Sequence, residues 1–165
     1  MRCSQNDERL AQLAILEAYK SHLPMKHGCI AVVGGKVVAR GCNHYRTFSK
    51  DGLIDQCCSC HAEIDVIRKC LKQNIKNKIN LYVVRVSESG EYRNSAPCQQ
   101  CVNVMKNHNI KMIIYSTDDG DLRKCKLIHY TNSHITGGAK AIRNNRVSSK
   151  HMGKYIVFKD NLKYL

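Results

Sequence analysis

Two short motifs constrain the fold of this chain more than any other feature, because their side chains are suited to meet at one metal ion. One is His61-Ala62-Glu63 and the other is Pro97-Cys98-Gln99-Gln100-Cys101. They offer one imidazole and two thiolates, which are zinc ligands, and one carboxylate that is not needed as a ligand. A chain that uses both motifs must fold so that residues 61–63 lie beside residues 97–101.

Each motif is expected to open a helix. Apolar residues at helical spacing follow His61 to about residue 73, and a second helical pattern covers residues 98–107. Strands are expected at 79–86 and 111–115, on both sides of the second helix, which predicts a βαβ unit with parallel strands. Helices in such a unit begin at the carboxyl edge of the sheet, where both motifs would meet.

The N-terminal part of the chain predicts a helix followed by a hairpin. The helix covers residues 7–19 and starts after Asn6, a residue type that caps helices well. The hairpin joins two apolar runs, 29–33 and 36–39, through Gly34-Gly35. Glycines accept the positive backbone angles that a two-residue hairpin turn requires.

The remaining signals complete a single domain. Weaker patterns predict a strand at 127–130, a short helix at 139–145 and a final strand at 155–158. Residues 42–60 are polar and cysteine-rich, and an irregular stretch of that length is often functional. No linker or repeat divides the chain, so we expect residues 1–165 to form one domain. The predicted class is α/β, with three layers, α/β/α, around a mixed sheet of about five strands.

Composition bounds the class of protein. A chain of 165 residues is long enough to bury one core without disulfide support. Its first residues are polar and it contains no run of about 18 apolar residues, which predicts that it does not enter a membrane. The 10 cysteines come without an export signal, so we expect reduced thiols and a cytoplasmic, reducing location.

The charge balance indicates the class of partner. The chain has 27 Lys and Arg against 13 Asp and Glu, a formal net charge of +14. Such an excess attracts partners that carry phosphate, which include nucleotides and nucleic acids. The alternative is a solvated basic surface without a specific partner.

The motifs and their surroundings resemble the cytidine/deoxycytidylate deaminase superfamily over about residues 6–117. The resemblance rests on Cys60-His-Ala-Glu-Ile-Asp-Val-Ile67 and Ala96-Pro-Cys-Gln-Gln-Cys-Val102. Gly41-Cys42-Asn43 is similar to a Gly-x-Asn of the deoxycytidylate and tRNA-adenosine branches. The resemblance implies zinc as cofactor, hydrolytic deamination of a small-molecule cytosine nucleotide with release of ammonia, and a homo-oligomer.

The resemblance also implies a role for each site residue. The zinc ligands would be His61, Cys98 and Cys101. Three protein ligands leave the fourth zinc position to water or a ligand. Glu63 would move protons among the attacking water, the ring nitrogen and the departing ammonia. The N–H of Ala62 would hold the carbonyl of the base, and Asn43 would contact base or sugar.

Three further side chains are candidates for substrate binding. Tyr45 and Arg46 in the long loop are suited to stack on or steer a substrate, or else are ordinary exposed loop residues. His134 lies in residues 133–140, whose hydroxyls, glycine amides and lysine are apt donors to an anion. A plain surface turn is the commoner use of such a segment.

The cysteines before the first motif leave two other arrangements open. Cys60 is placed to close a structural zinc site as the fourth ligand, in which case Glu63 is only an acidic residue at a helix start. Cys57, Cys58 and Cys60 are also placed to bind a second metal with His44, although their spacing favours free thiols.

Three functions fit these features. We prefer an enzyme that acts on a free cytosine nucleotide, for which a small phosphate pocket and a long loop of residues 42–60 over the site make sense. The positive charge is spread along the chain and not concentrated in one arm, which weakens the nucleic-acid alternative. The second is a deaminase of tRNA or another nucleic acid, for which backbone phosphates supply most of the affinity. The third is a catalytically silent zinc module that binds nucleic acid, against which Glu63 argues, since such a module has no use for that carboxylate.

Overall fold

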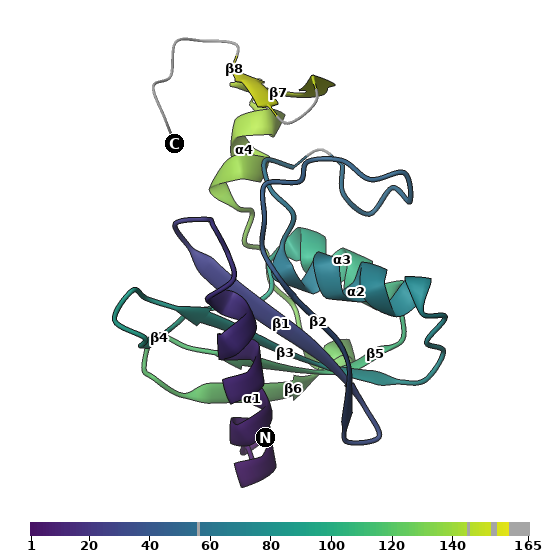
Figure 1. The fold of residues 1–165 in the computed structure, drawn as a ribbon, viewed down its shortest axis with the longest axis vertical. Coiled ribbons are helices and arrows are strands. Elements are labelled where there is room, and N and C mark those ends of the chain that lie inside the picture. Colours follow the sequence, from purple (N-terminus) through teal and green to yellow (C-terminus); the bar gives the residue numbers. More distant parts are fainter. Residues whose placement is uncertain (56, 145, 153–154, 159–165) are drawn as a thin grey trace.

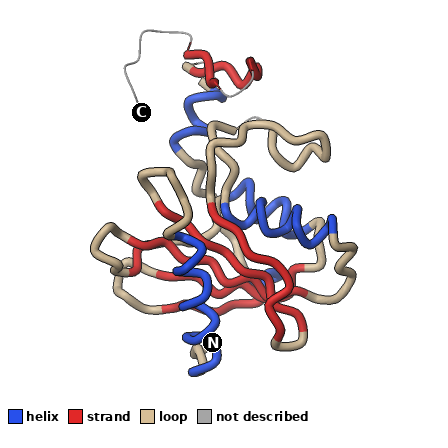
Figure 2. The backbone as a smooth tube through the Cα atoms, in the orientation of Figure 1, coloured by secondary structure: helices blue, strands red, loops and turns tan. Residues whose placement is uncertain are grey.

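A computed structural model describes residues 1–55, 57–144, 146–152 and 155–158. Its main sheet has the strand order β2-β1-β3-β5-β6, and β4 pairs with the last residues of β3 (Figures 1 and 2). The strands of this sheet are β1 (Lys26–Val33), β2 (Lys36–Cys42), β3 (Ile79–Val86), β4 (Tyr92–Arg93), β5 (Ile110–Ser116) and β6 (Leu122–Lys126). A separate two-stranded sheet consists of β7 (Val147–Met152) and β8 (Tyr155–Phe158). The helices are α1 (Gln5–Ala18), α2 (Ala62–Lys72), α3 (Gln99–Lys106) and α4 (Gly137–Arg143).

Helices cover both faces of the main sheet (Figure 1). Helix α1 packs on one face, where Ile30 and Val32 of β1 join its core. Helices α2 and α3 pack on the other face, where Cys29 and Ala31 join a second core. Successive residues of a strand point to opposite faces, which is why alternate residues of β1 enter different cores. The predicted three-layer α/β fold with a mixed sheet is confirmed.

The directions of the strands place both motif helices at one edge of the sheet. Strands β3 and β5 are parallel and connected through α3, as predicted. Strand β1 is antiparallel to both β2 and β3, so β2 and β3 run in the same direction. Helix α3 follows β3 through the two-residue strand β4, and α2 follows β2 through the long loop. Both helices therefore come after strands that point the same way, at the edge where those strands end.

Most predicted elements occur where the local patterns placed them. The predicted hairpin turn is confirmed, because Gly34 and Gly35 have φ values of 55° and 79°. The predicted strands 79–86 and 155–158 match β3 and β8. Within the described ranges, none of the helices has the length and apolar character to cross a membrane.

The predicted strand at 127–130 is wrong. Residues Leu127–His129 form a 3-10 helix, and the neighbouring strand is β6, which pairs with β5. Leu127 and Tyr130 are buried, whereas Ile128 between them is 81% exposed. A spacing of three between buried residues matches the three residues per turn of a 3-10 helix, and not the alternation of a strand.

Gly28 in β1 lets α1 lie directly on the sheet. A Cβ at this position would collide with the backbone of α1 at Ala14 and Ala18. Because helix backbone cannot yield as a flexible side chain does, we expect Gly28→Ala to lower the free energy of unfolding by about 3 kcal/mol.

Urea unfolding followed by circular dichroism measures this loss. Gly137→Ala is the matched control, since a Cβ there meets nothing within 4 Å. Equal urea midpoints for Gly28→Ala and the unmodified protein would show that α1 does not rest on β1 as described.

Candidate active site

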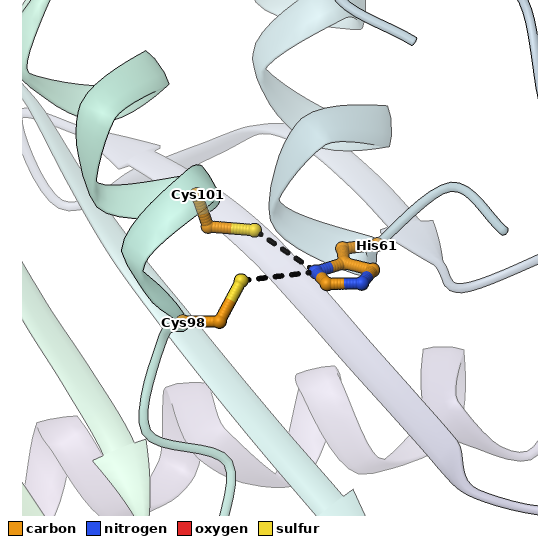
Figure 3. A group of neighbouring side chains, drawn as sticks. All are labelled: His61, Cys98 and Cys101. Carbon is orange, nitrogen blue, oxygen red and sulfur yellow. Dashed lines mark hydrogen bonds between the residues drawn. The ribbon is translucent and has the colours of Figure 1, made fainter. Parts of the chain in front are cut away.

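The three predicted metal ligands lie together (Figure 3). His61 is the N-cap residue of α2, Cys98 is the N-cap residue of α3, and Cys101 lies in the first turn of α3. The Nδ1 atom of His61 is 3.1 Å from the Sγ atom of Cys101 and 3.5 Å from that of Cys98. All three ligand atoms lie within 4.8 Å of one another.

The starts of the two helices explain why these side chains can converge. His61 and Cys98 have extended backbone angles, with φ and ψ of −76° and 152° and of −71° and 168°. In the described part of the chain, neither side chain is used to cap its own helix. Both are thus available to the site, and the positive ends of the helix dipoles favour thiolates there.

The donor set fits zinc with one position left open. Tetrahedral zinc with bonds of about 2.0 to 2.3 Å separates its ligand atoms by about 3.3 to 3.8 Å, close to the spacing in this cluster. Cys60 is not a member of the cluster, and its thiol lies 3.4 Å from the carbonyl oxygen of His61. The geometry favours a site with three protein ligands over a closed structural site.

A second metal site finds no support in the residues that the structure describes, where the His61 cluster is the one group of this kind. The thiol of Cys58 lies 3.5 Å from the carbonyl oxygen of Gly138. The imidazole of His44 lies 3.5 Å from the carboxylate of Asp65. Cys57 and Cys58 are present as free thiols.

Hydrogen bonding makes Cys98 the readier thiolate of the pair. A hydrogen bond from Cys101 and the neighbouring His61 lower the pKa of Cys98 to about 4, against the effect of burial. The same hydrogen bond, burial and the charge of Glu63 raise the pKa of Cys101. Burial alone would lower the pKa of His61, but Cys98 and Glu63 raise it. The pair therefore favours a thiolate at Cys98, and a bound cation would favour a second thiolate at Cys101.

Glu63 lies in the first turn of α2, beside the ligands but outside the cluster. Its side chain is buried, with 5% of the residue exposed. Burial raises the pKa of Glu63, and the positive charge of His61 opposes the shift. A carboxyl group with a raised pKa next to the open metal position is suited to take up a proton and pass it on.

Asn43 is bound to the start of β1. Its Oδ1 accepts a hydrogen bond from the backbone N–H of His27 at 2.9 Å, and its Nδ2 donates to the carbonyl oxygen of Met25 at 2.6 Å. Its own carbonyl oxygen accepts from the hydroxyl of Ser21 at 2.9 Å. Asn43 therefore anchors the segment before β1 in this structure, in addition to any contact with substrate.

The remaining sequence candidates lie in two exposed segments. Tyr45 is 58% exposed, and Arg46 donates from Nε to the carbonyl oxygen of Phe48 at 2.7 Å. His134 is exposed, but its carbonyl oxygen accepts the N–H of Gln99 at 3.0 Å. This bond joins residues 133–140 to the start of α3, next to the metal ligands.

His27 is a site residue that sequence reasoning missed. Burial lowers its pKa to about 4, and the charges of Arg85, His61 and Cys98 act on it as well. The effects of His61 and Cys98 indicate that the imidazole lies near the metal cluster. No motif marks His27, and only the pairing of β1 with β3 brings it to this place.

Comparison with known proteins agrees with the geometry. Similar folds occur in a dCMP deaminase from the cyanophage S-TIM5, in complex with dCMP and dUMP (21% identity, 70% of this chain and 83% of that chain covered, TM-score 0.53). They also occur in a cytidine deaminase from Burkholderia pseudomallei (20% identity, 76% and 94% covered, TM-score 0.55). A comparison with curated protein sequences finds no match.

A comparison with models of protein families identifies the family of this chain. The model of the cytidine and deoxycytidylate deaminase zinc-binding region matches residues 4–117. The match includes both motifs, both motif helices and the strands β1 to β5 that position them. Because it covers more than half of the chain and contains the whole ligand cluster, the chain belongs to the cytidine and deoxycytidylate deaminase family, whose cofactor is zinc.

Proposed function

We propose that the protein removes the amino group of a cytosine nucleotide, of the deoxycytidylate or cytidylate type, by hydrolysis with release of ammonia. The observation that carries this proposal is the open cluster of three ligands beside a buried carboxyl group with a raised pKa. The cyanophage enzyme of similar fold is described with dCMP and dUMP, a substrate and product of this kind.

The residues of the site have separate tasks in this reaction. His61, Cys98 and Cys101 would hold zinc, which when bound supplies a Lewis acid that makes water acidic enough to ionise near pH 7. Glu63 takes up one proton of the attacking water and delivers it to the ring nitrogen of the base. It then takes the proton of the newly added hydroxyl group, which becomes the carbonyl, and passes it to the amine, so that the C–N bond breaks and ammonia leaves. The N–H of Ala62 belongs to the first turn of α2, where it has no partner within the helix and is suited to bind the carbonyl of the base.

The segments around the ligands are suited to recognise the rest of the nucleotide. We expect Asn43, Tyr45 and Arg46 on one side and His134 on the other to contribute to substrate binding. The thiol of Cys58 lies 3.5 Å from the carbonyl oxygen of Gly138, which brings the loop of residues 42–60 to the start of α4. A free nucleotide is small enough to be bound between such segments, which supports this class of substrate.

A deaminase of RNA or DNA is the second candidate, and the net charge of +14 favours it. Tyr45 and Phe48 are exposed by 58% and 49%, and exposed aromatic rings can stack on bases. A catalytically silent zinc module is disfavoured, because burying Glu63 is costly and serves no purpose without proton transfer.

The salt dependence of turnover separates a nucleotide from a nucleic acid. For a nucleotide enzyme we expect kcat/KM for deoxycytidylate to exceed that for deoxycytidine by about tenfold to a hundredfold, because one phosphate makes charged hydrogen bonds. Raising salt from about 50 to about 200 mM should weaken this turnover only modestly. For a nucleic acid, several phosphates are bound at once and affinity should fall by orders of magnitude.

The measurement is ammonia release from deoxycytidylate, deoxycytidine and a structured RNA at both salt concentrations. Equal kcat/KM for nucleoside and nucleotide would contradict recognition of the phosphate. Turnover of the RNA alone, with a steep fall in salt, would establish the second candidate in place of the first.

A further inference from the structure

Three basic side chains stand in one row across the sheet. His27 of β1 pairs directly with Arg85 of β3, and Arg85 pairs directly with Arg93 of β4. Residues that are directly opposite each other on antiparallel strands project from the same face. Cys29 and Val83, two residues away from His27 and Arg85 on their strands, belong to the core under α2 and α3. The row therefore projects on the face of the sheet that carries the metal cluster.

One end of this row lies next to the metal ligands. His27 is close enough to His61 and Cys98 for their charges to shift its pKa, and the charge of Arg85 acts on the same imidazole. Arg85 faces the same imidazole across the β1–β3 pair. A substrate held at the open metal position and extending toward this row would meet His27 and Arg85.

Arg85 is the member of the row that is free to bind an anion. Its residue is only partly exposed, and in the part of the chain that the structure describes its guanidinium has no ion-pair partner. Arg93 differs, because its guanidinium lies 2.9 Å from the carboxylate of Glu91. A partly exposed guanidinium without an ion-pair partner is available to bind an anionic ligand.

The backbone of Arg85 is fixed from both sides. Its N–H donates to the hydroxyl of Ser116 at 3.1 Å, and that hydroxyl donates to the carbonyl oxygen of Arg93 at 2.7 Å. Ser116 is fully buried. On the other side, Asn43 binds the N–H of His27 and fixes the strand opposite Arg85. Because the backbone of Arg85 is already fixed, binding a ligand through its guanidinium costs less conformational entropy.

The zinc site cannot act as the anionic partner of Arg85. Two thiolates balance the double charge of a zinc ion, so the occupied cluster carries no net charge. The phosphate group of a substrate would therefore have to be bound by a different cation on the same face of the sheet. A guanidinium is well matched to phosphate, because it donates two parallel hydrogen bonds.

We propose that Arg85 binds the phosphate group of the nucleotide substrate and selects nucleotide over nucleoside. This inference rests on the proposed function, since the ligand is the substrate of the same site. It places the phosphate on strand β3, and not on residues 133–140, which the sequence favoured through His134. The two placements lie on different elements and can be tested separately.

Binding of a product analogue tests the proposal without turnover. Isothermal titration calorimetry compares deoxyuridylate with deoxyuridine on the zinc-loaded protein and on Arg85→Gln, His134→Ala and Arg123→Gln. We expect Arg85→Gln to weaken binding of deoxyuridylate by about tenfold to a hundredfold and to leave deoxyuridine unchanged. Arg123→Gln is the matched control, because Arg123 is exposed on β6, and it should change neither affinity.

The outcomes distinguish this inference from the proposed function. If Arg85→Gln weakens binding of neither ligand, or of both equally, the proposed role of Arg85 is wrong. If His134→Ala weakens binding of deoxyuridylate alone, the phosphate is bound by residues 133–140 instead. Should Arg85→Gln not fold, Arg85→Lys makes the same test, with a selective loss of about tenfold because lysine lacks the paired donors. A wild-type protein that prefers deoxyuridylate but releases no ammonia from deoxycytidylate would overturn the proposed function and leave the phosphate site standing.

Discussion

Cys98→Ala is expected to remove zinc from the protein and, with it, both turnover and much of the stability. Cys98 is the thiolate that forms first, because its pKa is lowered to about 4. Two remaining ligands bind zinc far more weakly than three. A protein that holds zinc at about 1,000 times its Kd gains about 4 kcal/mol from binding, which corresponds to about 8 to 16 °C in Tm for a chain of this size.

Metal analysis and thermal unfolding with and without a chelator check this prediction. The unmodified protein should lose the stated stability when zinc is removed, whereas Cys98→Ala should melt at the same low temperature in both conditions. Cys70→Ala is the matched control, since Cys70 is also buried but lies outside the cluster. Its variant should lose some packing energy and keep its zinc. One zinc retained per chain in Cys98→Ala would remove Cys98 from the ligand set.

Glu63→Ala is expected to lower kcat by about 10² to 10⁴ while the protein keeps its zinc. Glu63 is buried beside the cluster without belonging to it, so its loss removes proton transfer and leaves the three ligands in place. Turnover of deoxycytidylate and metal content, measured on the same sample, check both parts. Glu88→Ala, at an exposed position, is the control with full activity. A folded, zinc-loaded Glu63→Ala protein with unchanged kcat would exclude Glu63 from the mechanism.

The raised pKa of Glu63 adds a second readout to the same prediction. Because burial raises this pKa above 4.5, the folded state prefers the protonated carboxyl, and its contribution to stability is lost as pH rises through the folded pKa. In the zinc-free protein, Glu63→Gln should therefore gain stability relative to wild type as pH rises above about 4.5. Urea midpoints at several pH values measure the gain, and a difference that does not change with pH would contradict the assigned shift.

Local sequence patterns predicted the parts of this protein that depend on near neighbours in the chain. Gly34-Gly35 predicted the hairpin turn because only backbone angles are involved, and both residues have positive φ. The strand, helix and strand around Pro97–Cys101 predicted a parallel pair, and the right-handed crossover rule leaves little choice there. The ligand types and their spacing predicted the metal cluster, since Cys98 and Cys101 sit one helical turn apart and His61 opens the other helix.

The tertiary structure decided which distant residues share the site. Alternation along β1 and β3 indicates which residues share a face, but only the register of the two strands places His27 opposite Arg85. The same holds for His134, whose carbonyl reaches Gln99, and for Asn43, whose side chain binds the start of β1. The 3-10 helix at Leu127–His129 is also a tertiary result, because it buries Tyr130, whose hydroxyl donates a hydrogen bond to the carbonyl oxygen of Pro97. These contacts join segments that are far apart in sequence, and their energies depend on packing that no local pattern records.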